Sequence, residues 1–234
     1  TESLGDPVRS VHRTRDGSLL IGGFAQVWSE RPAPATVKAL GHELGLSSVH
    51  AIGALDGDGY WAVRFYRDRK LMRLAPDGSL RYAIPLPADS LPYEAFQIVQ
   101  TRDSVIWLGT TRGLMRHRPG TRTVDPVALD QTMLRSPRAP VTDLLVDDRD
   151  HLWALFAEQH IMRMAAGTRE QRYTEARGQD AIGMAVLDED RLIVAHRNAP
   201  PELVDRRTLE LRAMALPEVP PAALTFATAS HTPI

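Results

Sequence analysis

The sequence DSVIWLGTTRGLMRHRPG, residues 103–120, holds two short apolar runs that are separated by a Gly-Thr break and closed by a Pro-Gly pair. Short apolar runs bounded by Asp, Gly and Pro are typical of β-strands joined by tight turns. The first run is centred on Trp107. This stretch therefore predicts a strand, a turn and a second strand, and its recurrence along the chain decides the fold.

The same pattern recurs, so that five units align on Trp107. The residues that occupy the Trp107 position in the other units are Leu20, Trp61, Trp153 and Ile193. Twelve residues before these anchors lie Val8, Val49, Ala95, Val141 and Ala181, and nine residues before them lie Val11, Ile52, Ile98, Leu144 and Met184. A constant offset over five units indicates an array of structural repeats.

Each repeat reads as four strands. A first strand such as VHAIGAL (49–55) is followed by an Asp-rich turn, the anchor strand, a third strand such as GLMRHRP (113–119) and a weaker fourth such as LRYAIPL (80–86). Four short strands per repeat are typical of a β-propeller blade. A lone blade would leave two apolar faces in water, so we expect Trp61, Trp107 and Trp153 to be buried between stacked blades.

The sequence thus predicts an all-β protein, a β-propeller of four-stranded antiparallel blades with about five repeats. We place the repeats at approximately 8–48, 49–94, 95–140, 141–180 and 181–222, with a partial strand at 223–230 that opens a further unit. Both ends resemble blade junctions, which favours a segment of a larger propeller. The alternative is that the last strand completes a blade and closes a small ring.

Composition excludes several classes of protein. The 234 residues carry a formal net charge of −1 and no cysteine, so neither nucleic-acid binding by a global field nor disulfide or thiolate chemistry is expected. No apolar run approaches the length of a membrane span within this segment. We find no phosphate-binding loop, no nucleophile elbow and no metal-ligand spacing, so no cofactor, no metal and no catalytic residue is predicted. The DGDG stretch, 56–59, is interpreted as a turn, because Arg67 stands where a calcium loop needs its bidentate Glu.

The repeat also predicts a ligand site. In a propeller the turns between first and second strands lie on one face, and the loops between second and third strands lie on the other. The first set is acidic, whereas the second carries Arg64, Arg67, Arg69, Arg112, His160, His196 and Arg197 against only Asp68 and Glu158. We expect a small anionic or carbohydrate-like ligand at this second face, bound by charge-assisted hydrogen bonds and stacked on Tyr66 or Phe65. His50 and Arg9 are further candidates at this second face, because they lie at the start of first strands. The alternative is a solvated rim, because Arg and Asp favour surfaces in any case.

Residues 103–119, with the phrase LGLSSVHAIGALDGDGYWAV (44–63), resemble the repeats of two-component regulator propellers. That family's repeat has a lead-in, a strand, an acidic turn, Ile-Trp-hydrophobe-Gly-Thr, then Gly-Leu and a basic or aromatic residue before a Pro turn. The repeats anchored at Leu20 and Ile193 keep the spacing and lose the Trp. The resemblance implies a non-catalytic ligand-sensing region of a histidine kinase or diguanylate cyclase. It also implies a periplasmic location, membrane anchoring elsewhere in the protein and a possible homodimer through the propeller.

Two alternatives remain open. Residues 56–87 are also similar to the repeats of streptogramin lyase-like propellers, whose activity needs His and Glu around a metal. The only nearby candidates for that set are Glu158 and His160, with no second His in a matching loop. The other alternative is a scaffold that docks proteins through its rim.

Overall fold

The structure is a computed structural model of the chain. It describes the strand backbones at 8–13, 19–23, 27–30, 37–40 and 49–54, and then residues 59–64, 69–87, 95–134, 136, 138–165, 167–168, 170–178 and 180–214. Side chains are described from residue 59 onward, except those of Arg64, Ala95 and Phe96. The predicted partial strand at 223–230 lies outside the described residues.

Consecutive strands form five four-stranded antiparallel sheets. The first two contain β1 (Val8–Arg13), β2 (Leu19–Gly23), β3 (Val27–Glu30) and β4 (Val37–Leu40), then β5 (Val49–Ala54), β6 (Tyr60–Arg64), β7 (Lys70–Leu74) and β8 (Leu80–Pro85). The third contains β9 (Ala95–Gln100), β10 (Ile106–Thr110), β11 (Gly113–His117) and β12 (Asp125–Pro126). The last two contain β13 (Val141–Val146), β14 (His151–Phe156), β15 (His160–Ala165) and β16 (Gln171–Glu175), then β17 (Ala181–Val186), β18 (Arg191–His196), β19 (Glu202–Asp205) and β20 (Leu211–Ala213).

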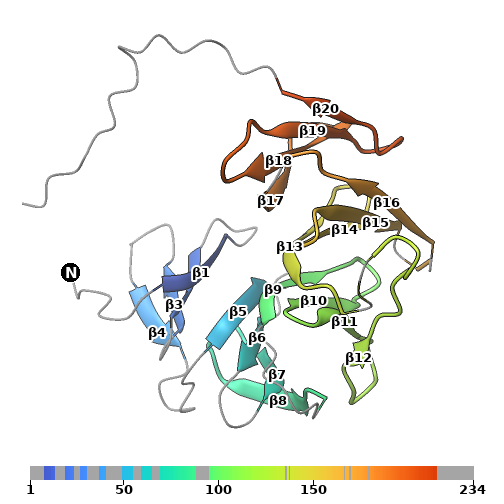
Figure 1. Cartoon of the computed structure of the whole chain (residues 1–234). Helices are drawn as coiled ribbons and strands as arrows, with labels where there is room; N and C mark the ends of the chain where they lie inside the picture. The colour runs from blue at the N-terminus through green and yellow to red at the C-terminus, as the bar shows by residue number, and fades with distance from the viewer. Residues whose placement is uncertain are drawn as a thin grey trace, which may run out of the picture.

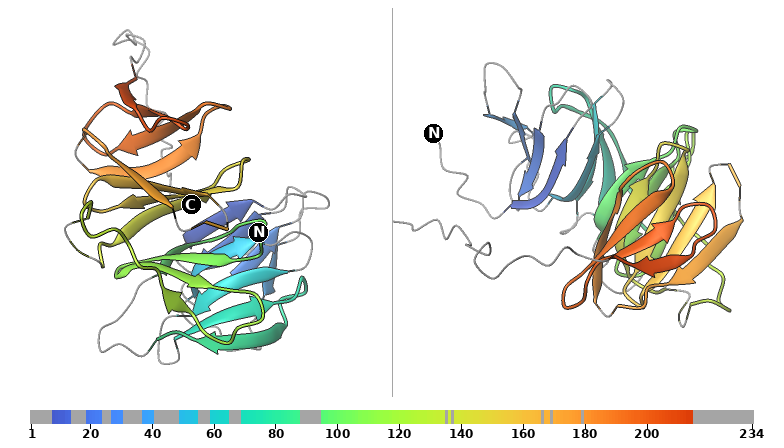
Figure 2. Two further views of the ribbon diagram at one scale, coloured as in Figure 1. Left: turned by 90° about the vertical axis from the view of Figure 1, so that its right-hand side faces the viewer. Right: turned by 90° about the horizontal axis from the view of Figure 1, so that it is seen from above.

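The sheets follow one another in an arc, each with its first strand toward the inside and its fourth toward the outside (Figure 1). Two further views show them standing face to face (Figure 2). The first strands of successive sheets contact one another, β1 with β5, β5 with β9, β9 with β13 and β13 with β17. The predicted all-β propeller architecture with four-stranded antiparallel sheets is confirmed.

The three tryptophan anchors are buried between sheets, as predicted. The exposed fraction is 5% for Trp61, 5% for Trp107 and 0% for Trp153. Each belongs to a different apolar cluster that joins its own sheet to the next one in the chain. Because successive side chains of a strand alternate between faces, the anchor packs on the following sheet while Leu108, its neighbour, packs on the preceding one. Stacking therefore removes both faces of each middle sheet from water.

Gly109 shows how closely the sheets approach. A Cβ atom at this position would lie 2.9 Å from Val141 Cγ1 and 3.1 Å from Leu144 Cδ1 of the next first strand. The missing Cβ atom therefore leaves room for side chains of the next first strand. Gly59 has a different role, because its φ of +111° is a backbone conformation that favours glycine, and it ends the predicted DGDG turn, whose other residues are not described.

Candidate functional site

All five first strands are interrupted at the same place. The pairing of the first strand with the second shifts register between Val8 and Ser10, Val49 and Ala51, Val141 and Asp143, and Ala181 and Gly183, and at the matching point of β9. A β-bulge of this kind leaves one residue out of the ladder and re-aims its side chain. The residues left out are Arg9, His50, Phe96, Thr142 and Ile182.

We call these five residues the bulge arc. Each lies second in the innermost strand of its sheet, and these strands are neighbours, so the arc follows the inner edge of the propeller at one end. Two of the predicted site residues, Arg9 and His50, belong to it. Sequence reasoning missed Phe96, Thr142 and Ile182, although all five stand eleven residues before their anchors.

Two side chains of the bulge arc are described. Ile182 is 50% exposed, the largest exposed fraction of the exposed large hydrophobic residues in the described part of the chain. Thr142 is half-buried, and its hydroxyl donates to the carbonyl oxygen of Leu155 at 3.2 Å. This end of the innermost strand of the last sheet therefore exposes an apolar side chain to solvent.

Three of the predicted cations lie at the same end of their blades as the bulge arc. Arg112 lies in the turn after β10, where its backbone N donates to Thr110 Oγ1 at 3.1 Å. His160 opens β15 opposite Glu175, and both Arg112 and His160 are half-buried. Arg197 follows β18 and is exposed, and its backbone N donates to the carbonyl oxygen of Asp180 at 3.0 Å.

His196 has a different environment from the other predicted residues. Its imidazole is fully buried, with Nε2 3.2 Å from Glu202 Oε2. A Cβ atom at Gly178 would lie 2.8 Å from the ring, so the backbone there packs directly on it. The Glu202 carboxylate also accepts hydrogen bonds from the backbone N of Arg177. These contacts indicate a packing role within the last two blades, which separates His196 from the other predicted site residues.

The remaining predicted contacts fall on side chains outside the described part of the chain. Arg64 ends β6, its side chain is not described, and Tyr66 and Arg67 lie outside the described residues, as does Phe65. Two acids also lie at this face, Glu175 at the end of β16 and Asp180 directly before β17. The prediction did not count these two acids, because it considered only the loops between second and third strands.

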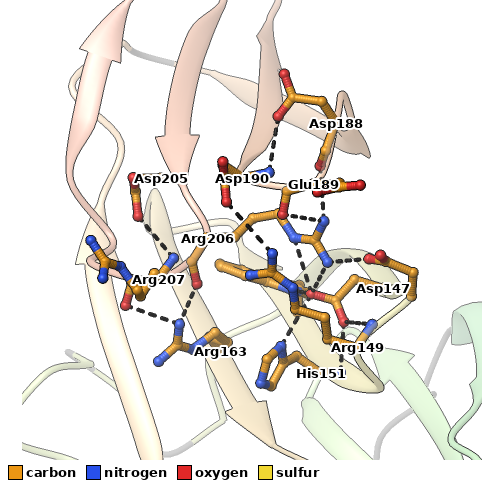
Figure 3. A network of polar contacts seen from close by, with 12 residues as sticks. Asp147, Arg149, His151, Arg163, Asp188, Glu189, Asp190, Asp205, Arg206 and Arg207 are labelled. Atoms are coloured by element: carbon orange, nitrogen blue, oxygen red, sulfur yellow. Dashed lines mark hydrogen bonds and ion pairs between the residues drawn. The ribbon is translucent and has the colours of Figure 1, made fainter.

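The opposite face carries a polar network that the sequence did not suggest (Figure 3). Arg206, in the β19–β20 turn, is 1% exposed and reaches the fourth sheet, where its Nη2 lies 2.8 Å from Asp147 Oδ2. It also pairs with Asp148 and donates from Nη1 to the carbonyl oxygens of Asp188 and Glu189 at 2.8 and 2.9 Å. The guanidinium therefore joins the β13–β14 turn of the fourth sheet to the β17–β18 turn of the fifth.

The Asp147 carboxylate is the centre of this network. Oδ2 accepts from Trp153 Nε1 at 2.9 Å, and Oδ1 accepts from the backbone N of His151 at 2.8 Å. Burial opposes its ionisation, but the hydrogen bonds from Trp153, His151 and Arg206 together lower the pKa of Asp147 below its usual value. The hydrogen bond from Arg206 likewise lowers the pKa of Asp148. The acidic turns of these two sheets are thus partly neutralised by arginine on their own face.

A second arginine extends the network. Arg163 stands opposite Trp153 in the sheet, with Cζ 5.9 Å from the ring centre, and it donates to the carbonyl oxygens of Arg206 and Arg207. Arg73 has the same relation to Trp61, at 5.5 Å, which indicates a repeated cation–π contact. We call the contacts of Arg206 with Asp147 and Asp148 the clamp, because they join two blades. These contacts indicate a structural role and no catalytic chemistry.

Among the residues that the structure describes, no group of three or more His, Asp or Glu side chains could hold a metal ion. In the same residues no helix is long and apolar enough to cross a membrane. A polar groove of about 440 Å³ lies between the outer strands of the last two sheets, lined by Thr174, Glu175, Arg177, Leu209, Glu210 and Leu211.

Comparisons with known proteins bear on the fold. No family model matches the chain, and no curated protein matches it in sequence. The extracellular domain of BT4673 from B. thetaiotaomicron, described as a one-component system in one structure, is similar with a TM-score of 0.68 and 16% identity over 89% of this chain. A second structure describes it as a hybrid two-component system and aligns with a TM-score of 0.63 over 93% of this chain. The chain spans about a third of the length of that domain, 30% and 34% in the two structures.

Two other propellers align as well. Streptogramin B lyase matches with a TM-score of 0.72 and 14% identity, covering 92% of this chain and 71% of the lyase chain. The C-terminal WD40 domain of Sif2 matches with a TM-score of 0.67 and 11% identity, covering 90% of this chain and 58% of that chain. At these identities the matches show a shared propeller fold alone.

Proposed function

We propose that the chain is a non-catalytic ligand-binding propeller of a bacterial signalling receptor, periplasmic and anchored to the membrane through another part of the protein. The two-component regulator pattern of residues 103–119 and the similarity to the extracellular domain of BT4673 support this reading. The observation that supports the binding role is the bulge arc, because a bulge repeated in all five first strands places five different residues at one end of the inner edge.

The chemistry of this end favours a small anionic or carbohydrate-like ligand. Arg9 and His50 in the bulge arc, with Arg112, His160 and Arg197 in the loops beside it, supply donors for carboxylate or hydroxyl groups. Ile182 supplies an exposed apolar surface for a sugar ring or an aliphatic chain. Arg64, Tyr66 and Arg67 belong to the same loop set by sequence. Binding would act on the output part of the receptor by changing how blades or a possible homodimer pack.

Titration calorimetry with glucuronate and with succinate tests this proposal. Charge-assisted hydrogen bonds are worth about 1.5–3 kcal/mol, so we expect the double variant Arg9→Ala with Arg112→Ala to weaken binding roughly tenfold or more. Arg118→Ala is the matched control, since Arg118 is exposed on the same blade but lies beyond β11, at the opposite face. Equal affinity in the double variant and the control would contradict the site, and no binding of either probe would contradict the ligand class.

A second candidate function is a lyase-type enzyme, favoured by the alignment with streptogramin B lyase over 92% of the chain. Glu158 and His160 are both half-buried near the start of β15 and would be its metal ligands. Metal analysis of purified protein separates the two functions. A stoichiometric divalent ion that is lost in the His160→Ala variant would favour the enzyme over the sensor.

A further inference from the structure

The innermost strands of the last three sheets are joined by two polar side chains. The Gln97 side chain in β9 accepts a hydrogen bond from the backbone N of Leu144 in β13 at 2.6 Å. Asp143 in β13 accepts one in the same way from the backbone N of Met184 in β17 at 2.5 Å. The two side chains thus satisfy backbone donors on the inner edge of the sheets, where an innermost strand has no further ladder partner.

The Asp143 carboxyl lies between two members of the bulge arc. Asp143 directly follows Thr142 in β13. Its Oδ2 lies beside Gly183, where a Cβ atom would be 3.5 Å away, and Gly183 directly follows Ile182 in β17. A ligand that contacts the bulge arc at the fourth and fifth sheets would therefore lie close to this carboxyl.

The carboxyl is buried, and Asp143 is 7% exposed. The groups that face it within the described part of the chain are uncharged: the Gln97 amide, the backbone N of Leu144, the backbone N of Met184, Gly183, and Leu155 of β14. Burial raises the pKa of Asp143, and the hydrogen bonds from Met184, Gln97 and Leu144 offset this effect only in part. An anion placed nearby adds like-charge repulsion, which favours the neutral carboxyl further.

We infer that Asp143 takes up a proton when an anionic ligand binds at the bulge arc. The inference rests on the proposed function, since it needs an anionic ligand at this end of the propeller. By linkage, proton uptake on binding makes the affinity for the ligand rise as the pH falls, by at most about tenfold per pH unit for one proton. The receptor would then respond to ligand and to pH together.

Titration calorimetry with glucuronate and with succinate, each in phosphate and in Tris buffer, measures the uptake. The observed heat differs between the buffers by their ionisation enthalpies for every proton exchanged. We expect proton uptake in the wild type and a smaller uptake in Asp143→Asn, which keeps the size of the side chain and cannot ionise. Histidine can also take up protons, and His50 and His160 at this end are present in both proteins. The difference between the two proteins therefore isolates Asp143.

The matched control is Asp180→Asn. Asp180 directly precedes β17 at the same end, but it is exposed, so water already solvates its charge. This variant removes the same charge and should retain the proton uptake of the wild type. Equal uptake in the wild type and Asp143→Asn, or an equal decrease in both variants, would overturn the inference and leave the proposed function intact. No binding of either probe would overturn both.

Carbon-13 NMR of the Asp143 carboxyl gives a readout that needs no ligand, and its signal is identified by its absence in Asp143→Asn. In the free protein the titration midpoint should lie above the ordinary carboxyl value of about 3.9, because burial opposes ionisation. Saturation with glucuronate should raise the midpoint further. A midpoint at the ordinary value in the free protein would overturn the inference even where a ligand binds.

Discussion

The interface between the third and fourth sheets and that between the fourth and fifth share one geometry but use different polar groups. At the first, Trp107 Nε1 donates to the Thr101 hydroxyl at 3.0 Å, and the Gln97 amide bridges the first strands. At the second, the same two positions are Asp147 and Asp143, both buried, and Arg206 is added. The repeat therefore fixes where polar contacts occur and leaves their charge free to vary. At these matching positions the first interface is neutral and the second is ionic, although the Thr101 hydroxyl also donates to the Asp103 carboxylate and the backbone N of Arg102 donates to Asp150 Oδ1 at 2.8 Å. The stability of the neutral interface should therefore depend less on pH, and the ionic interface should be vulnerable to loss of a single partner.

The largest effect is expected from Arg206→Ala. Removing one partner of a buried ion pair leaves the other charge uncompensated and costs about 3–5 kcal/mol. Arg207→Ala is the matched control, because Arg207 is exposed in the same turn. Denaturant unfolding gives the total loss. Hydrogen exchange of the indole N–H groups shows which interface is weakened. The Trp153 indole proton should lose protection, while the Trp107 indole proton should keep it. Equal loss at both indoles would show that the two interfaces do not behave separately.

Gly109→Ala should damage the neutral interface instead. The new methyl group would lie 2.9 Å from Val141 Cγ1, and overpacking of this kind costs about 1–3 kcal/mol. Gly183→Ala is the matched control on a first strand, because its nearest neighbour, Asp143 Oδ2, would be 3.5 Å away, an ordinary contact. Here the Trp107 indole should exchange faster and the Trp153 indole should not. Equal stability of the two variants would contradict the close approach of the third and fourth sheets.

The pH dependence of stability separates the interfaces further. The folded-state pKa values of Asp147 and Asp148 are lowered, so their stabilisation is present above the ordinary carboxyl pKa of about 3.9 and is lost as pH falls through the lowered values. Asp143 acts in the opposite sense, because burial raises its pKa, so stability falls as pH rises through that value.

Thermal midpoints measured from pH 7 to pH 3 check this balance. The acid-induced loss should shrink in Arg206→Met, where the clamp is already absent. It should be unchanged in Thr142→Val, which removes the hydrogen bond from the Thr142 hydroxyl to the carbonyl oxygen of Leu155 and so involves no ionisable group. An Arg206→Met profile that runs parallel to that of the wild type would exclude the clamp as a source of the pH dependence.

The sequence predicted the architecture well, because burial between stacked sheets requires apolar residues at fixed intervals. The anchors at Trp61, Trp107 and Trp153 are buried between sheets, where the repeat predicted them. The bulge was also accessible from the sequence, since its residues have a constant offset from the anchors. It was missed because the extra residue is under no apolar constraint and differs in every repeat.

The clamp could not have been predicted in the same way. Arg206 occurs in one repeat only, so no periodic signal identifies it among the arginines of the chain. Its partner Asp147 resembles the solvated acids of the other turns, and only the fold brings the two within 2.8 Å across a separation of 59 residues. The same limit applies to His196, whose burial against Gly178 and Glu202 depends on a linker that the repeat does not define.

The smallest effect is expected from Arg149→Ala, which tests whether the ionic interface extends beyond its buried centre. Arg149 Nη2 lies 3.5 Å from Asp190 Oδ1, between the turns that Arg206 joins, but the two side chains are 41% and 79% exposed. Exposed pairs are screened by salt and lose side-chain freedom on pairing, so the change should stay within about 0.5 kcal/mol, the usual range for surface substitutions. Unfolding at low and high salt provides the measurement, with Arg172→Ala, from an exposed pair within one sheet, as the control. A larger loss of unfolding free energy at low salt than in the control would mean that the exposed charges of Arg149 and Asp190 act together with Arg206. The two interfaces would then differ in long-range electrostatics as well as in one buried ion pair.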